Sequence, residues 1–253
     1  MHVVADKPFA PTATAGRELA EAAQSAGVVL TVFHNRRWDA GIRTLRATLG
    51  RLGNLQRIAS RFDLDQPGLL ETGPHGGLLR DLGSHLVDQM LWLLGPAASV
   101  HAALDWTDFP DGRTDWAFDI TLTHLSGVRS RVCSTKLNRL DDRELRAYGT
   151  AGAYIGHSTD VQARASLAGK RPADLGDAWG FEPAESWGVL YTADGAAKVP
   201  SERGAYQDYY SGLVAALRGE GPVPVPVSEA IDVLEVLDAA RTSAAEGRVV
   251  ALT

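Results

Sequence analysis

The first 38 residues show the apolar and polar pattern of a parallel βαβ unit. Residues 3–5 are apolar and end a predicted strand, and residues 12–26 have the Ala- and Glu-rich composition of a helix. Residues 28–33 form an almost wholly apolar run with several β-branched side chains. Such a run indicates a strand that is covered on both faces, as in a parallel sheet. Strand, helix and strand in this order predict one crossover unit.

The middle of the chain changes from helical to alternating patterns. Helices are predicted over residues 40–49 and 78–94, with a strand over 55–65 between them. From residue 97 apolar and polar positions alternate, which indicates antiparallel strands with one buried and one solvent-exposed face. The strands predicted there are 97–106, 116–124, 128–137, 145–148 and 153–155.

The last third of the chain is predicted only in part. Residues 157–188 are rich in Gly, Pro and Trp and have no assignable pattern. Helices are predicted over residues 202–217 and 228–246, with Ser228 as N-cap, and a short strand over 249–252 closes the chain. A parallel βαβ unit followed by antiparallel strands and helices predicts an α/β (α+β) protein.

Composition and charge exclude several function classes. The chain has 253 residues, of which 45% are apolar and 22% charged, as in ordinary globular proteins. A net charge of −6 gives no electrostatic reason to expect a nucleic acid or an anionic membrane as partner. The single cysteine, Cys133, excludes an internal disulfide and a zinc site built on several cysteines. With no signal-peptide pattern and no long apolar run, the chain is predicted to be soluble and cytoplasmic.

The strongest candidate for chemistry lies within residues 76–88. Asp81 and His85 are four residues apart and share one face of a regular helix. A carboxylate in this position can orient an imidazole and stabilise its charged form, as a general acid or base requires. An ordinary helical ion pair is the alternative interpretation. A metal site of Asp81, His85 and Asp88 has suitable spacing, but no further ligand cluster supports it, and none is expected.

Two loops follow the predicted parallel strands. Asp6, Lys7 and Pro8 leave the first strand, and residues 34–38 leave the second. Open α/β sheets bind ligands at the carboxyl ends of their strands, and a proline restricts the preceding residue to extended backbone angles. Lys7 is therefore a candidate ligand-binding residue, although a surface lysine is the alternative when the loop is taken alone.

Taken together, these pieces resemble the Gfo/Idh/MocA family, the glucose–fructose oxidoreductase and inositol dehydrogenase group. The matching segments, in chain order, are residues 2–10, 34–38, 76–95 and 225–244. In this family a Glu-Lys-Pro loop ends a strand of the nucleotide-binding domain, and a helix of the second domain supplies Asp-x-x-x-His. Asp6 stands where the family usually has Glu.

The resemblance implies a domain organisation and an activity. Residues 1–38 would be the remnant of a Rossmann-type dinucleotide-binding domain, and residues 39–253 a substrate-binding and oligomerisation domain with a large, mainly antiparallel open sheet flanked by helices. The implied reaction is hydride transfer between NAD or NADP and a hydroxyl or carbonyl group of a sugar or cyclic polyol. The implied cofactor-binding residues are Asp6, Lys7, Pro8, Asn35 and Arg37.

The resemblance also assigns catalytic roles. Lys7, Asp81 and His85 would form the catalytic set. His85 would move the hydroxyl proton, Lys7 would polarise the substrate oxygen, and Asp81 would align His85.

One part of the family pattern is absent from the sequence. The chain contains no Gly-x-Gly-x-x-Gly motif, and therefore no acidic ribose-binding residue downstream of one. At about 30 residues per βαβ unit, the missing strands amount to roughly 90 residues. The chain is therefore expected to be truncated and to bind dinucleotide poorly. The alternative is a non-catalytic oligomerisation or regulatory module derived from the family. In either case the protein is expected to form a homo-oligomer through the large sheet.

Overall fold

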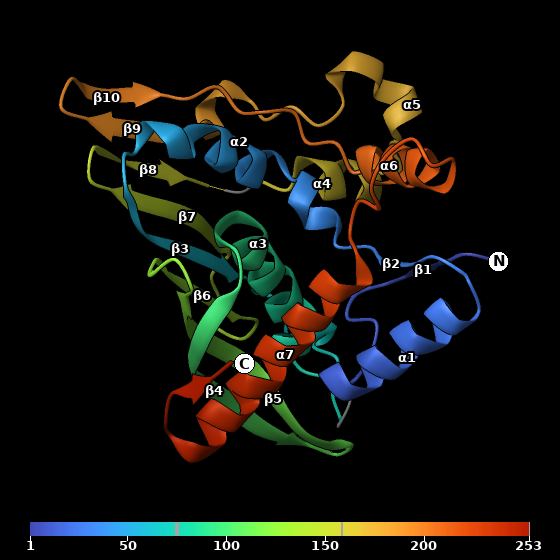
Figure 1. The fold of residues 1–253 in the computed structure, drawn as a ribbon. Helices are drawn as coiled ribbons and strands as arrows, with labels where there is room; N and C mark the ends of the chain where they lie inside the picture. The colour runs from blue at the N-terminus through green and yellow to red at the C-terminus, as the bar shows by residue number, and fades with distance from the viewer. Residues whose placement is uncertain (74–75, 158, 253) are drawn as a thin grey trace. The chain divides into compact units, whose positions relative to one another are not determined.

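The computed structural model describes residues 1–73, 76–157 and 159–252 (Figure 1). The chain divides into two compact units. Unit 1 comprises Met1–His34, Ser60–Asp142 and Val225–Thr253, and unit 2 comprises Asn35–Ala59 and Arg143–Pro224. The predicted domain boundary at residue 38 follows from the resemblance and not from contacts in space, so it stays a prediction.

Unit 1 contains the predicted βαβ crossover, which is confirmed. Strands β1 (Val3–Ala5) and β2 (Leu30–Val32) pair in parallel, and helix α1 (Ala13–Ser25) connects them. The hydroxyl of Thr12 caps α1 by accepting a hydrogen bond from the Ala15 amide. Helix α1 packs against the long helix α7 (Val227–Glu246), which Figure 1 shows in blue and red.

The predicted helix over residues 78–94 forms, but not as one regular α-helix. Leu79–Gly83 make a π-helical turn, η4, and α3 continues over Ser84–Leu94. At the start of this turn, the Leu79 amide donates to the Asp115 carboxylate with an N···O distance of 2.6 Å. Single π-helical turns are rare and often lie at functional sites.

Most of the strands belong to one mainly antiparallel sheet, as predicted. Its hydrogen-bonded order is β10-β9-β8-β7-β3-β6-β5-β4-β11. The strands are β3 (Leu55–Asp63), β4 (Ala97–Phe109), β5 (Gly112–His124), β6 (Arg129–Thr135), β7 (Asp142–Gly149), β8 (Gly152–Gly156), β9 (Val189–Thr192), β10 (Gly195–Lys198) and β11 (Val250–Ala251). Unit 1 holds β4, β5, β6 and β11, unit 2 holds β8, β9 and β10 with most of β7, and β3 contributes residues to both.

The alternation in β5 and β6 separates a buried face from an exposed one. Phe118, Ile120, Leu122 and Val132 are buried, whereas Arg131 is exposed on the opposite face. Helix α7 packs against β4, and α3 packs against α7 and β6. These two helices therefore cover the apolar face of the unit 1 strands.

Unit 2 contains the segment 157–188, which has no assignable pattern in the sequence. Its helices are α2 (Ala40–Thr48), α4 (Val161–Leu167), α5 (Pro172–Leu175) and α6 (Gln207–Leu217). Helix α6 begins five residues later than predicted.

The predicted N-cap of the last helix is wrong. Pro226, with φ −57° and ψ 141°, precedes Val227 as the cap of α7, and Ser228 lies inside the first turn. Proline suits a helix start because its amide carries no hydrogen to leave unpaired. Among the described residues, no helix has the length and apolar content needed to cross a membrane.

Candidate functional site

Lys7 is held in place at the carboxyl end of β1. Its Nζ donates to the Asp81 carboxylate oxygen Oδ1 at 2.9 Å and to the Asp81 main-chain oxygen at 3.0 Å. Only 15% of the Lys7 side chain is exposed to solvent. The structure thus brings together two predicted catalytic residues that are 74 positions apart in sequence.

A second lysine, which the sequence reasoning missed, binds the same carboxylate. Lys136 follows β6, and its Nζ donates to Asp81 Oδ2 at 2.7 Å and to the Leu69 carbonyl at 2.9 Å. The residue is only 4% exposed. Its signal in the sequence was its position, because Lys136 continues the buried positions Ser130, Val132 and Ser134 along an alternating strand.

The two lysines control the charge of Asp81. Burial by itself raises the pKa of this carboxyl, but the charge of Lys7 and hydrogen bonds from both lysines outweigh it, so the pKa lies below the ordinary 3.8. Asp81 is therefore ionised at neutral pH. Two ammonium groups beside one carboxylate leave an excess of positive charge, which can polarise a substrate oxygen and stabilise negative charge that develops on it.

His85 lies on α3 just beyond the π-helical turn and is 7% exposed. In a π-helical turn the repeat is wider than the four-residue spacing assumed for a regular helix. The predicted shared face of Asp81 and His85 therefore rested on the wrong helix geometry. Both carboxylate oxygens of Asp81 accept hydrogen bonds from lysines, and these bonds hold Lys7 and Lys136 in place. The predicted alignment of His85 by Asp81 stays a prediction.

The loop that carries Lys7 is fixed to the π-helical turn. The Arg80 guanidinium donates to the main-chain oxygens of Pro8 and Ala10 at 3.3 and 3.1 Å. Asp6 is exposed, and its carboxylate accepts a hydrogen bond from the Lys7 amide at 2.8 Å. Arg80 therefore joins the loop of Lys7 to the turn of Asp81.

The remaining predicted binding residues lie in unit 2. Asn35 and Arg37 belong to the short 3₁₀ helix η1 (Asn35–Trp38), and Arg37 is only 4% exposed. Their predicted contacts with a cofactor stay predictions.

The third residue of the possible metal site, Asp88, has another neighbour. Asp88 lies 3.8 Å from the His34 ring, and both side chains are buried. Within the part of the chain that the structure describes, no group of three His, Cys, Asp or Glu side chains is arranged to hold a metal ion.

The chain is similar in sequence to known oxidoreductases. Residues 42–155 match the model of the GFO/IDH/MocA C-terminal domain. The uncharacterised oxidoreductase YdgJ of Escherichia coli is 34% identical over 250 residues, which cover 94% of this chain and 70% of YdgJ. The scyllo-inositol 2-dehydrogenase (NADP+) IolW of Bacillus subtilis is 30% identical over 262 residues, which cover 99% of this chain and 72% of IolW.

The fold is also similar to solved structures. YvaA from Bacillus subtilis matches with a TM-score of 0.91 at 30% sequence identity, over 100% of this chain and 74% of that chain. Sequence and structure agree along nearly the whole length of the chain. The chain therefore belongs to the Gfo/Idh/MocA family of oxidoreductases.

Proposed function

We propose that the protein catalyses hydride transfer between NAD or NADP and a hydroxyl or carbonyl group of a sugar or cyclic polyol. Membership of the family supports the reaction class, and the relative IolW is by name an inositol dehydrogenase that uses NADP+. The observation that carries the proposal is the contact of Lys7 and Lys136 with one ionised carboxylate, Asp81. A scaffold has no need of two lysines, one partly buried and one buried, on a carboxylate that precedes a histidine by four residues.

The loop after β1 suits the nicotinamide end of the cofactor. It lies at the carboxyl end of a parallel strand, where open α/β sheets bind ligands, and it carries the fixed ammonium group of Lys7. In our proposal Asp6, Lys7 and Pro8 would hold the nicotinamide, and a cofactor-binding role for Asn35 and Arg37 is proposed from the resemblance alone. When bound, the cofactor supplies the group that takes or gives the hydride. No residue of this chain is assigned to its phosphates.

The protein's own residues then divide the remaining chemistry. Lys7 donates a hydrogen bond to the reacting oxygen and, with Lys136, stabilises negative charge on it. His85 takes the hydroxyl proton when the alcohol is oxidised and returns it when the carbonyl is reduced. Asp81 acts as a positioning residue, because it holds the two lysines side by side and keeps them from separating.

The proposal is tested with the purified chain. NADH and NADPH are titrated by fluorescence, and reduction of NAD+ and NADP+ is followed with a panel of polyols that includes scyllo-inositol. Because the sequence holds no Gly-x-Gly-x-x-Gly motif, we expect weak dinucleotide binding, and polyol-dependent reduction at high concentrations of at least one cofactor. The absence of both cofactor binding and turnover would reject the proposal for this chain and favour a non-catalytic oligomerisation or regulatory module.

We also propose that the protein forms a homo-oligomer through the sheet face that α3 and α7 leave uncovered. This face carries the exposed Arg131–Asp119 ion pair and a depression of about 390 Å³ lined by Trp116 and Cys133. A broad strand surface of this kind is suited to self-association. Sedimentation velocity on the purified chain should show a dimer or higher species, and a monodisperse monomer would contradict this part of the proposal.

A further inference from the structure

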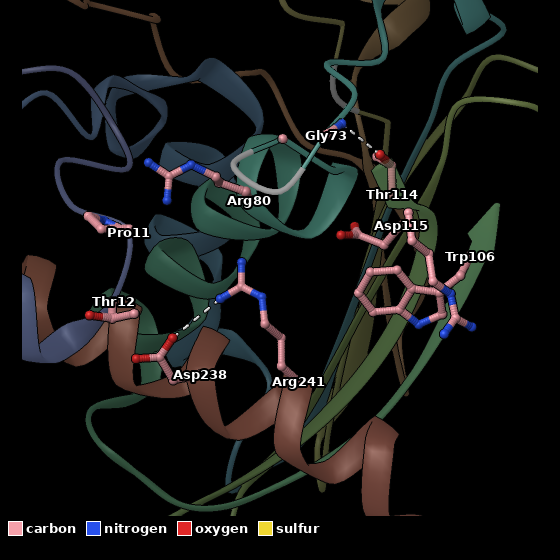
Figure 2. Close-up of a pocket in the computed structure, with 11 residues that line it drawn as sticks. Pro11, Thr12, Gly73, Arg80, Trp106, Thr114, Asp115, Asp238 and Arg241 are labelled. Atoms are coloured by element: carbon pink, nitrogen blue, oxygen red, sulfur yellow. Dashed lines mark hydrogen bonds and ion pairs between the residues drawn. The ribbon is translucent and has the colours of Figure 1, made fainter. Parts of the chain in front are cut away.

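A cavity in unit 1 brings together three arginines from different elements. It has a volume of about 330 Å³ and lies among the start of α1, the π-helical turn, the β4–β5 hairpin and α7 (Figure 2). Arg80 comes from the turn, Arg113 from the hairpin and Arg241 from α7. Lys7, Asp81 and His85 are not among its lining residues. The cavity is therefore separate from the candidate catalytic residues.

The arginine charges in this cavity act on one another. Figure 2 shows the side chain of Arg241 rising from α7 toward the turn that carries Arg80. Burial and the nearby charge of Arg241 both lower the pKa of Arg80, against a weaker opposite effect of Glu71. Two guanidinium groups that repel each other across a cavity would be stabilised by an anion between them.

The carboxylates of the cavity do not neutralise these arginines fully. Asp238 Oδ2 accepts a hydrogen bond from the Ala13 amide at 2.9 Å, and Oδ1 lies 3.3 Å from Arg241. Asp115 accepts one from the Leu79 amide. Both carboxylates thus stabilise the starts of helical segments, where amide hydrogens need acceptors. Among the residues that line the cavity, three guanidinium groups face two such carboxylates, so positive charge is in excess there.

The hairpin side of the cavity adds an aromatic wall. The guanidinium carbon of Arg113 lies 5.3 Å from the ring centroid of Trp106, which is 38% exposed. Stacking on the ring limits the positions that this guanidinium can take. The free part of the indole surface can contact the uncharged part of a ligand.

We propose that this cavity binds a small organic anion through its carboxylate or phosphate group. Guanidinium groups match the oxygens of either group with paired hydrogen bonds. The volume of about 330 Å³ is within the range of small-molecule sites, roughly 300–1,000 Å³. Arg80, Arg113 and Arg241 bind the anionic group, and Trp106 contacts the remainder of the molecule.

Arg80 connects this cavity to the candidate catalytic residues. The same guanidinium donates to the main-chain oxygens of Pro8 and Ala10, on either side of Phe9 in the loop that carries Lys7. Arg80 also precedes Asp81 directly in the chain. An anion bound to Arg80 therefore contacts the residue that fixes the Lys7 loop.

Isothermal titration calorimetry on the full chain at low ionic strength tests the proposal by binding alone, independently of the proposed activity. The probes are inorganic phosphate, succinate and uncharged glycerol. We expect saturable binding of phosphate or succinate, with the tighter of the two identifying the recognised group, and no binding of glycerol. Arg113→Gln and Arg241→Gln should each weaken binding at least about tenfold, because each removes a charge-assisted hydrogen bond.

Arg17→Gln is the matched control, since Arg17 pairs with Glu235 on the surface of α1 and α7 and does not line the cavity. It should bind the anion as the unmodified protein does. Arg241→Gln also removes a partner of Asp238, so thermal unfolding is measured for each variant. Arg113 is exposed, so Arg113→Gln changes the cavity and leaves the helices intact. Failure of both anions to bind the unmodified chain, or unchanged affinity in a folded Arg113→Gln variant, would overturn the proposal.

Discussion

A carboxylate in a partly buried site keeps its charge when cations lie beside it, and Asp81 has two. The contribution of the second cation can be measured through Lys136→Met, which removes the ammonium group and keeps a side chain of similar length. We expect a loss of about 1–3 kcal/mol in the free energy of unfolding, because a hydrogen bond to a charged group is removed from a buried position. Urea unfolding measures this loss. The exposed Lys170→Met is the matched control and should change stability little; an equal effect of both changes would contradict the assigned role of Lys136.

The lowered pKa of Asp81 predicts a pH dependence of stability with a definite sign. Folding favours the ionised carboxyl, so its pairing with lysines stabilises the protein fully above the unfolded value of 3.8. That stability is lost as the pH falls through the lower pKa of the folded state. Asp81→Asn should therefore flatten the decline in unfolding free energy between about pH 5 and pH 2. Parallel curves for the variant and the unmodified protein over this range would show that the carboxyl is not stabilised as described.

At the scale of elements, the π-helical turn depends on one glycine at its start. Gly77 has φ +101°, and a Cβ there would lie 2.2 Å from Asp115 Oδ1. Gly77→Ala should thus destabilise the fold by at least about 1 kcal/mol, because it adds both backbone strain and a clash with the carboxylate that binds the Leu79 amide. Gly68→Ala, where a Cβ would meet open space, serves as the control in chemical denaturation. Equal stability of the two variants would be inconsistent with this account.

Unit 2 has its own buried charge cluster, which joins three segments. The Tyr206 hydroxyl lies 2.5 Å from Asp39 and 3.1 Å from Asp160, and Arg36 Nη1 bridges the second oxygens of the same two carboxylates. Arg143 also contacts Asp160. Burial raises the pKa of Asp39 to about 6, even though Arg36 acts in the opposite direction. The cluster thus links η1, the start of α4 and the start of α6.

The raised pKa of Asp39 predicts a pH dependence of stability that is opposite in sign to the one predicted for Asp81. The folded state binds the proton of Asp39 more tightly than the unfolded state, so Asp39 makes stability fall as the pH rises from 3.8 to about 6. Asp39→Asn, which stays neutral, should remove this fall. Thermal unfolding at a series of pH values across this window measures the fall in stability. An unchanged pH profile in a folded variant would show that the protonation of Asp39 does not cause it.

At the scale of the whole molecule, the sequence predicted those elements whose apolar and polar pattern repeats regularly within one segment. The apolar run at residues 28–33 and the alternation around Ile120 predicted the parallel unit and the antiparallel strands, because a single period describes each. The π-helical turn was not predictable, since its start is bound by Asp115 on another element. The segment 157–188 had no period because short helices and turns fill it.

The candidate site was also predictable only in part. Lys7 and Asp81 were candidates from their positions in a loop and a helix, and the resemblance gave them catalytic roles. The structure brings their side chains together. Lys136 was missed because lysines are mostly exposed and almost never fully buried unless paired, whereas Lys136 is only 4% exposed. Its contact with Asp81 spans 55 residues of sequence, and no local pattern reports such a distance.

The central claim is that Lys7 and His85 act on one reacting oxygen while Asp81 holds the lysines in place. Its most direct test is kcat/KM for polyol oxidation with the preferred cofactor, measured for the unmodified protein and for Lys7→Met, His85→Ala and the control Arg17→Gln. The account predicts a loss of about a hundredfold or more for the first two variants and normal turnover for the control. Folded Lys7→Met and His85→Ala variants that turn over substrate at the unmodified rate would contradict it.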